Sequence, residues 1–110
     1  MNQPLQIGVV IASRALTFVR TDGSVEPVQV LIGAPVPDGE DSWSCPYLIQ
    51  ATSFKKLFRM VGVDSMQALI HTTHIIADEL GALSRKHGGT FHYFGDPDLA
   101  FPLPDRLGQR

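Results

Sequence analysis

One helical segment, about residues 65–86, constrains this chain more than any other feature. Asp64 is expected as its N-cap, with Gln67 three residues later, and Gly88-Gly89 should end the helix just after a basic turn. Mostly apolar residues recur at intervals of three and four and predict one buried face, which must pack on a sheet: Met66, Leu69, Ile70, Thr73, Ile76, Ala77, Leu80 and Leu83.

The rest of the chain has the period-two patterns and turn residues of β-structure. Asp22-Gly23 lies between two apolar runs and predicts a β-hairpin. The fold class is therefore α+β: a single domain over residues 1–110, in two layers, with an antiparallel meander of about four to five strands packed on the one long C-terminal-half helix. The strands are expected at about residues 5–20, 25–33, 42–50, 54–61 and 90–94, followed by an extended tail at 95–110.

Two features of the strands predict how the sheet is covered. Pro46 cannot donate to a β-ladder, so its strand should lie at a sheet edge or contain a bulge. Ile7–Ile11 is apolar on both faces and indicates a buried strand, so the tail near Phe101–Pro104 or a second subunit should cover the face that the helix leaves open. The core is expected to join the helix to seven strand residues: Leu16, Phe18, Val30, Ile32, Trp43, Tyr47 and Phe58.

Charge and composition argue against several function classes. The formal net charge is −2, so the chain lacks the basic surface of a nucleic-acid-binding protein. Cys45 is the only cysteine, which rules out an intrachain disulfide and favours a reducing compartment. The run IGVVIA is too short to span a bilayer and has no basic signal-peptide flank. We expect a cytoplasmic protein that binds neither nucleic acid nor membrane.

His71 and His74, with Asp78 one turn further on, raise the question of a metal site. A catalytic zinc site needs three protein ligands and a structural one needs four. The His-Glu-x-x-His pattern of zinc proteases is absent, because Thr72 and Thr73 separate the two histidines. These side chains lie opposite the apolar stripe, so a solvated or interfacial helix face is favoured, and neither a metal nor another cofactor is expected.

Other candidate catalytic groups have simple structural explanations. Cys45 alternates with aromatic residues in a strand, which indicates an inert buried thiol. His92 is expected to be a satisfied or surface histidine. Two groups of acidic residues lie among proline and glycine, where aspartate usually makes turn hydrogen bonds: Asp38, Glu40 and Asp41, and separately Asp96 and Asp98. No catalytic residue is assigned.

Three long segments resemble a known family: VQVLIGAPVPDGEDSWSCPYLIQ, VGVDSMQALIHTTHIIADEL and GDPDLAFPLP. Their Ile-Gly-x-Pro, Trp-x-Cys-Pro, Gly-Val-Asp-x-x-Gln-Ala-Leu and Phe-Pro-Leu-Pro motifs are similar to those of a family of small bacterial domains of unknown function. The resemblance extends over roughly residues 8 to 104. It implies a bacterial origin and a compact, strand-rich domain with one main helix, and it supplies no catalytic residue.

One part of the helix surface suggests a protein contact. Ile75 is expected to point away from the apolar stripe, and its neighbours His71, Ala68 and Ala82 complete a candidate interface. With the uncovered sheet, this favours a non-catalytic protein-binding module that forms a homodimer and could bind another bacterial protein, as an immunity or antitoxin-like subunit does. The alternative is a small hydrolase-like or metal-binding enzyme that uses the two helix histidines, Asp78 or the turn carboxylates.

Overall fold

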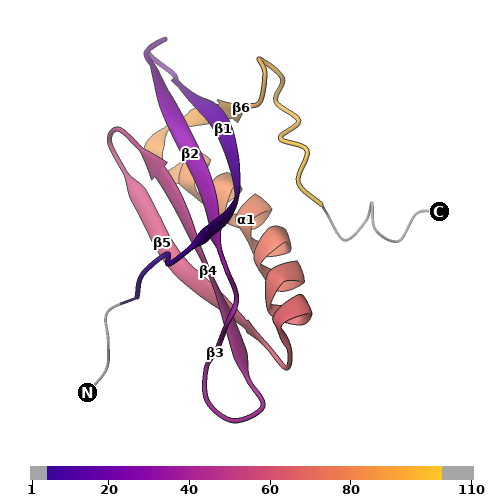
Figure 1. The fold of residues 1–110 in the computed structure, drawn as a ribbon. Helices are drawn as coiled ribbons and strands as arrows, with labels where there is room; N and C mark the ends of the chain where they lie inside the picture. The colour runs from indigo at the N-terminus through magenta and orange to yellow at the C-terminus, as the bar shows by residue number, and fades with distance from the viewer. Residues whose placement is uncertain (1–4, 103–110) are drawn as a thin grey trace, which may run out of the picture.

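The computed structural model describes residues 5–102 and confirms the α+β architecture, with a curled antiparallel sheet and one long helix along its side (Figure 1). The order of the strands is β5-β4-β2-β1-β6, and the short β3 pairs with one end of β4. Within the described residues no helix is long and apolar enough to cross a membrane. The elements are β1 (Val10–Arg20), β2 (Val25–Gly33), β3 (Val36–Pro37), β4 (Trp43–Ala51), β5 (Lys55–Gly62), α1 (Ser65–His87) and β6 (Gly89–His92).

The hairpin predicted at Asp22-Gly23 joins β1 to β2. The Arg20 amide donates to the Ser24 carbonyl at 2.8 Å, and the Gly23 amide donates to the Arg20 carbonyl at 2.9 Å. Of the two residues expected to need a positive φ, only Gly23 has one, at 90°. The loop is therefore longer than a two-residue turn, with glycine at the left-handed position.

Pro46 lies in an inner strand whose ladder with β5 has no register shift there, so the prediction of an edge strand or a bulge was wrong. β4 pairs with β5 along Trp43–Gln50, and on its other side with β2 from Tyr47 onward and with β3 at Trp43 and Ser44. Pro46 falls in the gap between the β2 and β3 ladders, where a ladder donor is not required. Proline does need a position where no backbone N–H has to donate to a neighbouring strand. A gap between two short ladders provides such a position as well as an edge does.

The ends of α1 follow the sequence prediction. The Asp64 side chain accepts a hydrogen bond from the Gln67 amide at 2.8 Å, and the Gln67 side chain accepts one from the Val63 amide at 2.8 Å. Gly88 takes a left-handed conformation, and its amide donates to the Ser84 carbonyl. These contacts satisfy backbone groups that a helix leaves unpaired at its ends.

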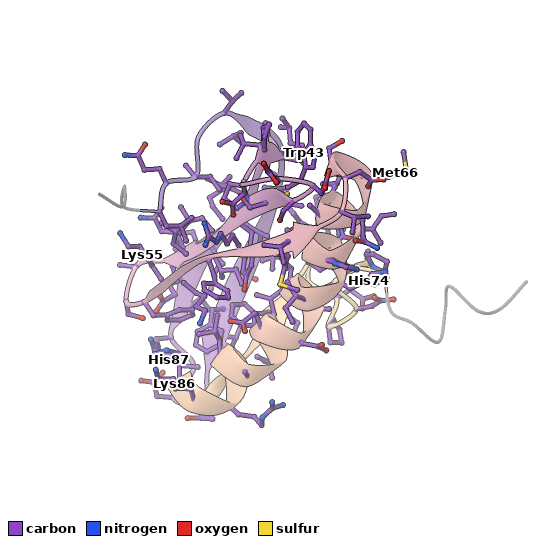
Figure 2. The ribbon with its side chains drawn as sticks, turned by 90° about the horizontal axis from the view of Figure 1, so that it is seen from below. Trp43, Lys55, Met66, His74, Lys86 and His87 are labelled. Carbon is purple, nitrogen blue, oxygen red and sulfur yellow. The ribbon has the colours of Figure 1, made fainter. Side chains whose placement is uncertain are left out.

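The buried face of α1 is rotated from the predicted stripe. Met66 is 69% exposed and Ile70 is 46% exposed, and Figure 2 shows Met66 pointing away from the sheet. Small residues explain the rotation, because a Cβ added at Gly62 would lie 2.5 Å from the Ala68 nitrogen, so the helix approaches β5 very closely there. The residues that face the sheet and are buried are Ala68, Thr72, Ile76, Leu80 and Leu83.

The strand part of the core was predicted well, with one error. Leu16, Phe18, Val30, Ile32 and Tyr47 are buried, and Trp43 packs against them. Phe58 was expected in the core and is 52% exposed. It lies on β5, the last strand on that side of the described sheet, so no further strand covers its outer edge.

The N-terminal residues differ from the prediction of a buried strand at about 5–20. β1 begins only at Val10, and Val9, Val10 and Ile11 are exposed. The chain before it crosses Gly33, since a Cβ there would lie 1.9 Å from the Ile7 carbonyl oxygen. This crossing, together with the positive φ of Gly8, turns residues 5–8 away from the ladder, and the Val9 carbonyl accepts from the Ala34 amide at 2.7 Å.

The segment after β6 packs against the core of the domain. β6 ends at His92 instead of residue 94. Leu99 and Phe101 are partly buried against the core. Residues 103–110 of the predicted tail, including Leu103 and Pro104, lie outside the described residues, as do residues 1–4.

Candidate functional site

The polar face of α1 does not assemble a metal site. His71 Nδ1 lies 2.9 Å from the Val61 carbonyl oxygen, so one ring nitrogen contacts β5. His74 lies on the side of the helix away from the sheet (Figure 2), and residues 5–102 show no ion pair between it and Asp78. The same range holds no group of three or more His, Cys, Asp or Glu side chains placed to bind a metal. The ligands suggested by the sequence are therefore not brought together.

Cys45 lies in the core, in an environment that suppresses its reactivity. Its side chain is fully buried on β4, and its Sγ donates to the Gly33 carbonyl at 3.4 Å. Burial raises the pKa of the Cys45 thiol, which disfavours the thiolate that a nucleophile needs. Thr72 Oγ1 also approaches the Cys45 carbonyl oxygen, at 3.3 Å, and links helix to strand. These contacts are typical of a structural cysteine.

Three of the turn carboxylates, Asp38, Asp96 and Asp98, have partners within the protein. Asp96 Oδ1 accepts from the Asp98 amide at 2.7 Å, and Asp98 Oδ1 accepts from the Ala100 amide at 3.0 Å. Asp38 pairs with Arg59 of β5 at 3.4 Å. The two acidic groups lie in separate loops, on either side of the helix in the sequence.

The predicted helix interface is not a continuous exposed patch. Ala68 is fully buried against the sheet, so its assignment to an exposed contact was wrong. Ile75 packs against the core, and His71 is partly buried over β5. Only Ala82 of the four residues is exposed. The rotation of α1 that buries Ala68 also brings Ile75 toward the sheet.

A more open surface runs along β1. One side of β1 pairs with β2 from Val10 to Val19, but the other side pairs with β6 only at Thr17–Arg20. Residues Val10–Leu16 therefore form an open edge, whose outward N–H and C=O groups make no backbone contact with any described strand. Val10 and Ile11 are 45% and 49% exposed on this edge. Such an edge is a ready template for a further strand.

An exposed aromatic residue lies at the end of the open edge. Tyr93 and Asp96 exchange two backbone hydrogen bonds, of 2.8 and 3.0 Å, around a two-residue turn. Both turn residues have positive φ, 51° at Phe94 and 78° at Gly95. Asparagine usually precedes glycine in such turns, because a larger L-residue is strained there. Phe94 is nevertheless 92% exposed, so the strain is not offset by burial within the chain.

Arg14 fixes the segment after this turn beside the open edge. Its guanidinium carbon lies 4.7 Å from the ring centroids of both Tyr93 and Phe101. Its Nη1 donates to the carbonyls of Leu99 and Ala100, at 3.0 and 2.9 Å. Ala100 is held at a positive φ of 60°, next to the Arg14 contact. The segment is thereby fixed by several contacts beside β1, and within residues 5–102 it makes no backbone hydrogen bond to Val10–Leu16.

A shallow cavity of about 210 Å³ lies between β1, α1 and the segment that Arg14 binds, here Ala100–Pro102. It has a floor of Val30 and Ile32 from β2 and a wall from Thr73 of α1, and Ala12 and Phe101 close its sides. The cavity is mainly apolar, and Arg14 is the charged group that lines it. The open edge therefore combines unpaired backbone, exposed apolar side chains and an adjoining apolar hollow, which are the elements of strand-addition sites.

Sequence reasoning missed this site because a free edge is a property of pairing. The length of β1 could be read from its pattern, but the shortness of β6 and its register opposite Thr17–Arg20 could not. One local signal was available: Phe94-Gly95 occupies a turn position where asparagine is usual.

Residues 12–103 match a family model described as Domain of unknown function (DUF6968). No curated protein and no solved structure matches the chain. The match covers the open edge from Ala12 onward, the helix, and Arg14 with the segment that it binds.

Proposed function

The chain belongs to the DUF6968 family of domains of unknown function, and from its geometry we propose that it is a non-catalytic protein-binding module that self-associates through the open edge of β1. The observation on which this proposal depends is the seven-residue stretch Val10–Leu16, which has no backbone partner on one side among the described residues. Added strands pair readily with edges of this kind.

The usual protections of an edge strand are weak here. Val10–Leu16 contains no proline and no lysine, and its one charged residue, Arg14, is bound to the segment after β6. A bulge at Val10/Ala12 is the one irregularity. Natural proteins normally protect a free edge with charges, proline or covering loops. Apart from the bulge and the neighbouring segment that Arg14 binds, Val10–Leu16 has none of these protections, which supports an edge that is covered by another chain.

The other residues support a binding module over an enzyme. Cys45 is buried with a raised pKa, and the two helix histidines lack further ligands within residues 5–102. Asp96 and Asp98 accept hydrogen bonds within their own loop, and Asp38 pairs with Arg59. We place the module in the cytoplasm, because one buried free thiol suits a reducing compartment.

Replacing Ile11 by lysine should shift the protein from dimer to monomer. Ile11 is half-exposed on the open edge, and a charge there must be desolvated when a second strand pairs with it. We expect the dissociation constant of the dimer to rise by about tenfold or more, because one good apolar contact is lost and a charge is buried. Sedimentation equilibrium over a range of concentrations measures it, with wild type expected at twice 12.0 kDa.

Val25→Lys is the matched control. Val25 is an exposed β-branched residue at the start of β2, away from the open edge, so the same charge should leave the dimer intact. A concentration-independent species of 12.0 kDa in the wild type would refute self-association. Equal dissociation by Ile11→Lys and Val25→Lys would place the contact elsewhere.

Phe94→Asn should affect folding and association in opposite directions. Asparagine tolerates the positive φ of this turn, so we expect the free energy of unfolding to rise by about 0.5–1 kcal/mol. Phe94 supplies a large exposed ring beside the open edge, so its loss should weaken the dimer. Urea unfolding of dilute monomer and sedimentation give the two quantities. If unfolding becomes easier, the ring contact with Tyr93 stabilises the turn more than the strain destabilises it.

A further inference from the structure

We infer that the partner on the open edge is a second copy of this chain, paired antiparallel about a two-fold axis at Ser13. This inference rests on the proposed self-association and adds its register. In such a pair, residues on opposite sides of Ser13 face each other across the two copies, since a two-fold contact uses the same surface twice. Ser13 is the midpoint of Val10–Leu16, so this register pairs the whole open edge.

The faces of β1 fix which side chains meet. Leu16 is buried on the helix side, and Arg14 and Ala12 follow on that side because strand side chains alternate. Ser13 and Ala15 are exposed on the other side. Around Ser13, Ala12 then lies opposite Arg14 of the second copy. The small Ala12 side chain leaves room for the guanidinium and for the segment that Arg14 holds.

Neighbouring registers fit less well. An axis at Arg14 places two guanidinium groups directly opposite each other, and like charges at facing positions destabilise a strand pair. An axis at Ala15 requires Ser13 to pair with Thr17, which already pairs with His92 of β6. An axis at Ala12 pairs only five residues of β1 and centres them on the bulge at Val10/Ala12. The Ser13 axis avoids the first two difficulties and places the bulge near the ends of the pairing instead of at its centre.

The same register accounts for exposed residues at the two ends of the edge. Leu16 lies opposite Val10 of the second copy, and Val9 precedes it. The Tyr93–Asp96 turn follows His92, which pairs with Thr17, so Phe94 lies close to this end of the edge. Phe94 of one copy thus contacts Val9 and Val10 of the other, and these are among the exposed apolar residues of the single chain.

Cysteine cross-linking tests the register. In facing positions of an antiparallel pair, Cα atoms are about 4.5–5.5 Å apart, within the range of about 4.4–6.8 Å that a disulfide spans. Ser13→Cys should therefore form a disulfide-linked dimer under mild oxidation, in most of the full-length protein. The native Cys45 is fully buried and does not compete. Non-reducing electrophoresis measures the linked fraction.

Ala15→Cys is the control on the same exposed side of the same strand. In the Ser13 register its two copies are offset by four residues, or about 13 Å, and cannot be bridged. Linkage at Ser13→Cys without linkage at Ala15→Cys supports the proposal. Equal linkage of both, or linkage of Ala15→Cys alone, overturns it. If the wild type is a dimer in sedimentation but Ser13→Cys does not link, the register is wrong and self-association still holds. If the wild type is a monomer, both the register and self-association are wrong.

Discussion

Leu80→Ala is expected to lower the free energy of unfolding by about 2–5 kcal/mol, the usual cost of removing a large buried aliphatic side chain. Leu80 is 1% exposed and lies on the buried face of α1 with Ile76 and Leu83. Its truncation removes apolar contacts and leaves a void between helix and sheet, where protein interiors are close-packed. Urea unfolding followed by circular dichroism gives the change.

Met66→Ala is the matched control for Leu80→Ala. Both are large apolar residues of α1, but Met66 is exposed and should cost less than about 0.5 kcal/mol. A cost at Met66 as large as that at Leu80 would mean that the helix packs through the face predicted from hydrophobic periodicity. If the slope of the unfolding free energy against urea concentration is unchanged in both variants, unfolding has remained cooperative.

Gly62→Ala should destabilise the protein by about 1–3 kcal/mol or more, as overpacking does. The added Cβ would lie 2.5 Å from the Ala68 nitrogen and 2.9 Å from the Gln67 carbonyl carbon, so the backbone of β5 or of α1 must move. Gly62 has no positive φ, and the loss arises only from space. The same displacement should weaken the contact between His71 and the Val61 carbonyl.

Gly81→Ala gives the opposite expectation and serves as the control. Gly81 lies inside α1, and the nearest heavy atom to an added Cβ is Arg85 Nη1 at 3.6 Å. Alanine should stabilise the helix by about 0.5–1 kcal/mol, because glycine loses more backbone entropy on folding. Equal effects of the two substitutions in thermal unfolding would show that β5 and α1 are not in close contact at Gly62.

Local features of the sequence determined where this chain forms its secondary structure. Asp22-Gly23 predicted the first hairpin, and Asp64, Gln67 and Gly88 predicted both ends of the helix. Each depends on contacts within a few residues, such as the Asp64 carboxylate on the Gln67 amide. The α+β class followed from these elements, because a single amphipathic helix must pack on the strands beside it.

Tertiary structure decided which surfaces are buried and which stay free. Periodicity placed Met66 and Ile70 toward the sheet, yet the close approach of Ala68 to Gly62 turned the helix and buried Thr72 instead. Pro46 needed only a position without a ladder donor, and the gap between β2 and β3 provided one inside the sheet. The open edge of β1 exists because β6 pairs only with Thr17–Arg20. Steric fit and strand pairing join residues far apart in the chain, so no local pattern could determine them.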